Sequence, residues 1–278
     1  MTSADYDPAE HYDRVTEAWR LLLGDELHYG VFEQGGEPLP VATGALTTRM
    51  IQAAQLQAGL DVLDVGCGSG TPACRLVADF DVRVVGITTS EVGVATARAR
   101  AASLGLPGAT FEQRDGTDNQ FRDESFDRVW ALESSHLMRD REALISECAR
   151  VLRPGGRFIL CDLTRQRDIP FDEVRTRRAD FVTLRTAFGD ARMEPLDYYT
   201  SLAETHGLVV DRADDLTALT LPTFEHWRRN AREHRDDVVA AIGVDGLDAF
   251  VRGADILEGF WRDGTLGYGL FSAAKPAA

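Results

Sequence analysis

A glycine-rich loop after a short apolar strand is the segment of this chain with the clearest chemical meaning. The strand covers residues 61–65, and the loop carries Gly66, Gly68 and Gly70. Glycines let the backbone approach a ligand closely, and a strand, glycine turn and helix in this order suit a nucleotide-like ligand at the carboxyl edge of a parallel sheet. Asp64, just before the turn, would repel a pyrophosphate. The segment therefore favours a ligand that carries an ammonium group.

The elements that must position this loop alternate between strand and helix. Thr71 is expected to cap the helix after the loop, with Pro72 in its first turn. Arg153-Pro154-Gly155-Gly156 should end a later helix, because proline and glycine break helices. Further strands are predicted over residues 83–87, 110–113, 126–132, 157–161, 208–210 and 269–273, and helical segments over 91–104, 140–152, 170–206 and 222–262. Such alternation predicts a parallel sheet with helices on both faces.

Four segments in the right order and spacing carry a family resemblance. Residues 64–70 resemble the first motif of class I S-adenosylmethionine-dependent methyltransferases. Residues 111–116 resemble the adenine-binding segment of that family, 126–131 its fourth strand and 152–156 the turn before its fifth strand. The resemblance extends over about residues 10–275. It implies an α/β fold, a Rossmann-like sheet of seven mostly parallel strands with helical lid insertions, and S-adenosylmethionine as the cofactor.

The resemblance also implies which residues bind the cofactor. Asp64 and the three loop glycines would hold its methionine end, and Asp115, next to Gly116, would accept a hydrogen bond from the adenine amino group. Glu133 is expected near the cofactor rather than in the chemistry. The second strand departs from the family pattern, because no acidic residue follows it to bind the ribose. We expect Thr88 and Ser90 to make the ribose contacts instead.

This departure resembles a branch related to cyclopropane synthases and to small-molecule methyltransferases of secondary metabolism. In that branch an N-terminal segment closes over the cofactor, and Tyr12, Tyr29 and Gly30 match it. Aromatic faces can shelter a sulfonium cation from water. The alternative is a helix that packs on the core, which we favour for Trp19.

A histidine and an aspartate follow strands that are neighbours in the family's topology. His136 follows the fourth strand and Asp162 the fifth. Their loops should therefore meet at the ligand edge of the sheet, where an aspartate would hold a histidine base in one tautomer. The segment resembles natural-product O-methyltransferases, including those that act on sugars. The alternatives are a histidine that packs in a wall or caps a helix, and an aspartate that serves as a structural cap.

Charge and cysteine usage limit the partners. The chain has 278 residues and a net charge of −15, which nucleic acid and anionic membranes repel. No residue spacing suggests a metal site, and the N-terminus does not resemble a signal peptide. Four cysteines without a pairing pattern suit a reducing cytoplasm. We expect a cytoplasmic enzyme with a small-molecule acceptor, and the sequence leaves open whether it forms a homo-oligomer.

The leading hypothesis is one methyltransferase domain that O-methylates a secondary metabolite. The domain would comprise an N-terminal helical flap over residues 1–45, a cofactor-binding core over 46–162, and the remaining strands with a helical substrate lid over 163–278. One alternative is carbon methylation of an isoprenoid or other alkene, which includes methylation coupled to cyclisation. Another is a protein that binds the cofactor without transferring methyl, as a cyclase or a sensor.

Overall fold

A computed structural model describes residues 8–277, and side chains from residue 15 onward. The chain divides into two compact units. The helical unit contains residues 1–46, 163–195 and 215–268, and the sheet unit contains residues 47–162, 196–214 and 269–278. A single-domain organisation remains a prediction.

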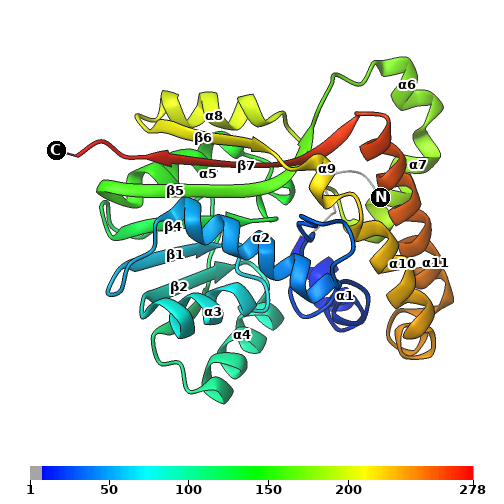
Figure 1. Ribbon diagram of the computed structural model, residues 1–278, viewed down its shortest axis with the longest axis horizontal. Helices are drawn as coiled ribbons and strands as arrows, with labels where there is room; N and C mark the ends of the chain where they lie inside the picture. The colour runs from blue at the N-terminus through cyan, green and yellow to red at the C-terminus, as the bar shows by residue number, and fades with distance from the viewer. Residues whose placement is uncertain (1–7, 278) are drawn as a thin grey trace. The chain divides into compact units, whose positions relative to one another are not determined.

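The strands form one seven-stranded sheet in the order β3-β2-β1-β4-β5-β7-β6. Pairing from β3 through β2, β1 and β4 to β5 is parallel throughout, and Figure 1 shows β2, β1, β4 and β5 side by side. The strands are β1 (Asp61–Val65), β2 (Arg83–Thr88), β3 (Ala109–Gln113), β4 (Phe126–Leu132), β5 (Leu152–Arg165), β6 (Val209–Asp215) and β7 (Leu266–Ala274). The predicted seven-stranded, mostly parallel α/β sheet is confirmed.

The helices of the sheet unit begin and end where local chemistry dictates. Ser90 caps helix α4, because its Oγ accepts a hydrogen bond from the Gly93 N–H, and Gly105 ends that helix in the left-handed conformation. Helix α3 begins after Gly70, so the prediction of Thr71 as its cap is wrong by one residue. The helices that belong wholly to this unit are α3 (Thr71–Phe80), α4 (Glu91–Leu104), α5 (Arg141–Val151) and α8 (Leu196–Thr205).

One face of the sheet carries the main apolar core of this unit. Leu63, Val129 and Phe158 from three adjacent strands pack against buried residues of α5 and α8, among them Cys148 and Tyr199. Asp64, which follows Leu63, points to the opposite face, because side chains alternate along a strand. The core therefore holds the strands in fixed positions beneath the loops at their carboxyl ends.

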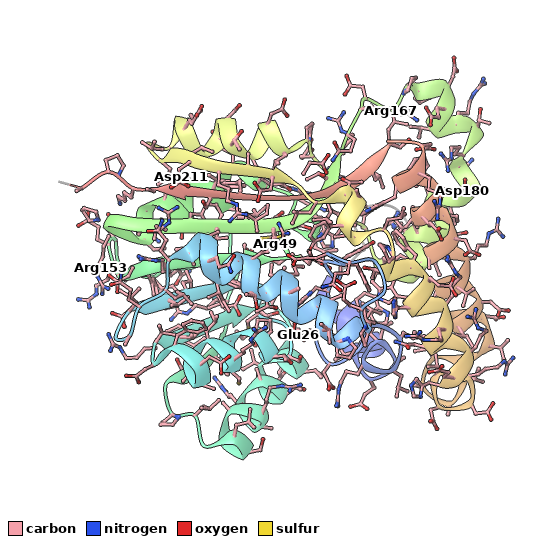
Figure 2. The ribbon with its side chains drawn as sticks, in the orientation of Figure 1. Glu26, Arg49, Arg153, Arg167, Asp180 and Asp211 are labelled. Carbon is pink, nitrogen blue, oxygen red and sulfur yellow. The ribbon has the colours of Figure 1, made fainter. Side chains whose placement is uncertain are left out.

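Three strands extend well beyond the sequence prediction, and one of them, β7, begins at Leu266, three residues earlier than predicted. Strand β5 begins at Leu152, so Pro154-Gly155-Gly156 lies inside an irregular strand where the β4–β5 register shifts, and not in a turn before it. Arg153 anchors this irregularity: its guanidinium lies 3.0 Å from Asp61 and 2.8 Å from Asp127 at the amino ends of β1 and β4 (Figure 2). Strand β6 is longer than predicted. It is an edge strand with alternating exposed residues, and a search for apolar runs misses such a pattern.

The helical unit is built around aromatic side chains. Tyr29 is stacked on Trp261 with ring centroids 5.4 Å apart, and Trp19 packs near Phe188, so the interpretation of Trp19 as a core residue is confirmed. Figure 1 shows α7, α10 and α11 packed together. The helices of this unit are α1 (Pro8–Leu23), α6 (Phe171–Thr176), α7 (Arg178–Phe188), α9 (Thr217–Thr220), α10 (Thr223–Glu233) and α11 (Arg235–Arg262), and helix α2 (Leu39–Ala54) continues from it into the sheet unit. None of the helices in the described part of the chain is long and apolar enough to cross a membrane.

Candidate active site

The strand order reverses beside β1, and this reversal defines the site. The chain passes from β1 to β2 and β3 on one side, and then returns to β4 on the other. Ligands of such sheets bind outside the carboxyl ends of the strands at this point. The loops after β1 and β4 touch there: a Cβ on Gly66 would lie 2.2 Å from the Cβ of Ser134, and Ser134 Oγ donates a hydrogen bond to the Val65 carbonyl at 2.7 Å.

Asp64 is a buried carboxylate without a hydrogen-bond partner among the residues that the structure describes. It is 3% exposed, and no donor among the described residues hydrogen-bonds it. Burial raises its pKa to about 7. An ionised carboxylate is costly in such a place unless a cation pairs with it. The ammonium group of a bound methionine moiety would supply that cation, so the residue fits the predicted cofactor.

We expect the affinity for S-adenosylhomocysteine to fall as the pH drops below 7, because the protonated carboxyl no longer attracts an ammonium group. Neighbouring Cys67 will not contribute, since burial, together with the charge of Asp64, raises the pKa of its thiol far above this range. In Asp64→Asn the affinity should be low, and its dependence on pH should disappear. Calorimetry between pH 6 and pH 8 tests this, and an unchanged pH dependence in the variant would exclude the assignment.

The same variant should be more stable without cofactor. The ordinary pKa of this carboxyl is 3.8, and its folded value is about 7, so ionisation of Asp64 penalises the folded state increasingly as the pH rises from about 4 to 7. Above pH 7 the penalty is complete. At pH 8, Asp64→Asn should therefore gain roughly 2 to 4 kcal/mol in the free energy of unfolding. Denaturant titrations at pH 8 and pH 4 measure the difference, which should vanish at the lower pH.

The other two glycines of the loop have different surroundings. Gly68 has a φ of +49°, and a Cβ added there would meet no atom of a described residue within 4 Å. Gly70 adopts the left-handed conformation before α3, with Phe111 and Ala97 packed directly against it. The free space beside Gly68 leaves room for a ligand.

The predicted adenine segment follows β3. Asp115 is exposed, and its Oδ1 accepts hydrogen bonds from the backbone and the hydroxyl of Thr117 at 2.8 and 2.7 Å. Gly116 is buried, and a Cβ there would lie 2.6 Å from Val65 of the neighbouring strand. Because Gly116 has no side chain, the backbone after β3 can lie against Val65 at the end of β1. Asp115, the preceding residue, therefore lies near the glycine loop that follows β1. Its contact with adenine remains a prediction.

Asp115→Ala should weaken binding of S-adenosylhomocysteine by roughly 5- to 100-fold, the effect of losing a hydrogen bond to a charged group. Asp118→Ala is the matched control, because Asp118 is an exposed aspartate in the same turn. Isothermal titration calorimetry on both variants checks the prediction. Equal affinities in the two variants would show that Asp115 does not bind adenine.

The predicted ribose residues both lie at the end of β2. The Thr88 hydroxyl lies 3.3 Å from the backbone N–H of Ser90, and the Ser90 hydroxyl caps α4. Both side chains therefore have a structural task, and their contact with ribose remains a prediction. Glu133 directly follows β4 with a φ of +46°, and its N–H donates to the Cys161 carbonyl at 2.9 Å.

The predicted flap residues belong to the helical unit. The Tyr29 ring is 2% exposed and is enclosed by aromatic rings of the same unit. The Gly30 N–H donates to Thr223 Oγ1 at 3.1 Å, and Ala42 leaves no room there for a Cβ. The side chain of Tyr12 lies outside the described residues. For Tyr29 and Gly30 the structure thus shows packing, and their closure over a cofactor remains a prediction.

The structure brings His136 and Asp162 into contact. His136 lies in a short 3₁₀ turn (Ser135–Leu137) after β4, and its Nδ1 lies 2.6 Å from Asp162 Oδ1. Asp162 Oδ2 also accepts the backbone N–H of His136 at 3.1 Å, so the aspartate caps the turn as well as orienting the ring. Since the carboxylate accepts from Nδ1, neutral His136 carries its lone pair on Nε2. No described residue hydrogen-bonds Nε2, and the side chain is 9% exposed.

The charges around His136 raise its pKa. Burial by itself lowers the pKa of the imidazole, but the charge of Asp162 and its hydrogen bond, helped by Glu133, outweigh this effect. Arg141 acts in the opposite direction. A raised pKa makes the neutral imidazole a stronger base. It also means that the imidazole becomes neutral, and so able to accept a proton, only at higher pH.

Sequence reasoning missed two further polar residues beside this pair. Ser135 Oγ lies 2.5 Å from Asp162 Oδ2 and 3.0 Å from the hydroxyl of Tyr199. The position of Ser135, next to His136 in the loop after β4, was a signal that could have identified it. Tyr199 lies 64 positions further along the chain, and no local pattern connects it with the loop.

Taken together, the fold and the site define an α/β protein with a glycine loop, a buried carboxylate and a histidine–aspartate pair near the carboxyl ends of its central parallel strands. Comparison with known proteins gives the family. A family profile described as "Methyltransferase domain" matches residues 63–160. The 27-O-demethylrifamycin SV methyltransferase of Amycolatopsis mediterranei is 33% identical over 276 residues, which cover 95% of each chain.

Solved structures agree with this result. The cyclase SpnF superposes with a TM-score of 0.83 and 25% identity over 97% of this chain and 96% of its own. The mycolic acid cyclopropane synthase CmaA1, solved with S-adenosylhomocysteine, has a TM-score of 0.85 and 22% identity over 96% of each chain, which shows a shared fold. The chain belongs to the class I S-adenosylmethionine-dependent methyltransferases, and S-adenosylmethionine is its cofactor.

Proposed function

We propose that this enzyme methylates a hydroxyl group of a small-molecule secondary metabolite. The observation that carries the proposal is the contact of 2.6 Å between His136 Nδ1 and Asp162 Oδ1, which leaves Nε2 available to an acceptor. A relative that covers nearly the whole chain is named for an O-methyl position of rifamycin, and this supports a role in antibiotic or related secondary metabolism.

Bound S-adenosylmethionine supplies an electrophilic methyl group on a positively charged sulfur. His136 Nε2 accepts the proton of the acceptor hydroxyl as the new O–C bond forms and the S–C bond breaks. Asp162 stabilises the imidazolium that results, while Asp64 pairs with the ammonium group at the other end of the cofactor. The products are the methyl ether and S-adenosylhomocysteine, and the proton remains on His136 until it passes to solvent.

The acceptor should be a small organic molecule and not a nucleic acid, since the net charge of −15 repels phosphates. We place the enzyme in the cytoplasm, where the four free, buried cysteines would stay reduced. Whether it forms a homo-oligomer can be measured by light scattering.

A panel of hydroxylated polyketides, glycosides and terpenoid indoles tests the proposal. Incubation with methyl-labelled cofactor should transfer label to an acceptor as a methyl ether, detected by mass spectrometry and NMR. A new carbon–methyl bond would establish carbon methylation in its place. Because SpnF is a cyclase, the second candidate is a cofactor-binding cyclase. In that case the acceptor would rearrange without label, and no S-adenosylhomocysteine would form.

A further inference from the structure

A chain of buried polar groups leads from Tyr199 through Ser135 to the aspartate that orients His136, and Arg141 lies beside it. Ser135, Tyr199 and Asp162 are each 0% exposed, and Arg141 is 4% exposed. The hydroxyl of Tyr199 lies 3.0 Å from Ser135 Oγ, which lies 2.5 Å from Asp162 Oδ2. These residues come from the loop after β4 and from α5, β5 and α8, all within the sheet unit.

The direction of each hydrogen bond in this chain is determined by chemistry. The Arg141 guanidinium, whose Nη2 donates to the His136 carbonyl at 3.0 Å, lies near Tyr199 and acts to lower the pKa of its hydroxyl. Ser135 has a single hydroxyl proton and gives it to the carboxylate of Asp162, so in the contact between the two hydroxyls Tyr199 donates to Ser135. The ionised carboxylate of Asp162 has only acceptors, so Ser135 donates to it. Each donor polarises the next, and such chains strengthen cooperatively in a buried environment.

We infer that Ser135 and Tyr199 are positioning residues that set the basicity of His136 by spreading the negative charge of Asp162. The inference rests on the proposed role of His136 as the base. A carboxylate that accepts the Ser135 hydrogen bond holds less charge on the oxygen facing His136. It therefore stabilises the imidazolium less, and His136 becomes neutral at a lower pH than Asp162 alone would permit.

The charged groups around His136 act on its pKa in both directions. Asp162 and Glu133 raise the pKa of His136, and Arg141 lowers it. Burial, with the charge of Asp162, raises the pKa of Tyr199 to about 12, so its hydroxyl stays a neutral donor throughout the range in which a histidine titrates. A change in the pH profile after removal of the Tyr199 hydroxyl therefore reports on its donation and not on its ionisation.

The test compares Ser135→Ala, Tyr199→Phe and the double variant in the full-length enzyme. The His136 ring is titrated by NMR, with its signal assigned by its absence in His136→Ala, and the pH–rate profile is measured in parallel. In Ser135→Ala, the midpoint of the His136 titration and the midpoint of the pH–rate profile should both move upward by roughly half to one pH unit. In Tyr199→Phe, both midpoints should move in the same direction by a smaller amount. Because Tyr199 acts through Ser135, the double variant should match Ser135→Ala.

Tyr198→Phe is the matched control. Tyr198 precedes Tyr199 on α8 and is 40% exposed, so its variant should keep both midpoints unchanged. If Ser135→Ala does not fold, Tyr199→Phe by itself tests the inference. This variant removes only the hydroxyl oxygen, and the remaining phenyl ring still fills the same space in the core. An NMR midpoint that stays in place in folded variants overturns the inference. An NMR midpoint that moves while the rate profile does not would support the network but reject His136 as the base.

Discussion

Replacement of His136 by alanine is expected to lower turnover by roughly 100- to 10,000-fold, the contribution typical of a general base. Binding of S-adenosylhomocysteine should stay nearly unchanged, because the groups that fit the cofactor's methionine end lie in β1 and in the loop after it and do not include His136. Calorimetry and single-turnover kinetics separate the two effects. His206→Ala is a suitable control, since His206 lies at the end of α8 in the same unit and has no part in the proposed chemistry.

The pH dependence gives this prediction a sign. His136 acts as a base only when neutral, so the rate of the unaltered enzyme should rise with pH through its raised pKa. Asp162→Asn removes the charge that raises this pKa, so the rising limb should move to lower pH. The maximal rate should also fall, though less than in His136→Ala, because asparagine keeps the shape but does not favour the productive tautomer.

The same variant distinguishes oxygen from carbon methylation. Methyl transfer to an alkene forms a carbocation first, and the base acts only afterwards. In that reaction His136→Ala would change the distribution of products more than the rate of cofactor consumption. Measurement of cofactor consumption together with product identity therefore separates the two chemistries. Full activity with an unaltered pH profile would remove His136 from both.

Gly68→Val should abolish measurable cofactor binding. The valine side chain would enter the free space beside the loop. The φ of +49° at this position is also one that residues with a Cβ rarely adopt. Strain alone could destabilise the fold, and a matched control measures this. Gly155 also has a positive φ, +78°, and open space around its Cβ, but it lies in the β5 irregularity at the amino end of the sheet.

Gly155→Val should therefore show the cost of strain without loss of the cofactor. Thermal unfolding of both variants gives the shared destabilisation, and calorimetry with S-adenosylhomocysteine gives the affinity. If Gly68→Val folds and binds S-adenosylhomocysteine with the affinity of the unaltered enzyme, the cofactor does not occupy the space beside this loop. Equal losses of affinity in the two variants would mean that strain, not steric overlap with the cofactor, is responsible.

Local signals were sufficient to predict most of the sheet unit. Strand β4 and helix α4 have the predicted boundaries, because an apolar run marks the strand, and Ser90 and Gly105 mark the ends of the helix. The prediction was less accurate where pairing decides the structure. Pro154 and Gly155 interrupt a helix in any context, but only tertiary pairing, with β4 on either side of them and between Gly155 and Lys275, makes them part of a strand.

The sequence by itself determined the cofactor loop, the family, and the presence of a histidine and an aspartate after two successive strands of the sheet. Those properties depend on residue types at short spacing, which local chemistry makes visible. Only the tertiary structure decided that Asp64 has no hydrogen-bond partner among the described residues, that Asp162 both caps the turn and orients His136, and that Tyr199 reaches Ser135 from 64 positions away. Burial and hydrogen-bond partners depend on how distant segments pack, and therefore the basicity of His136 could not be predicted from its neighbours in the chain.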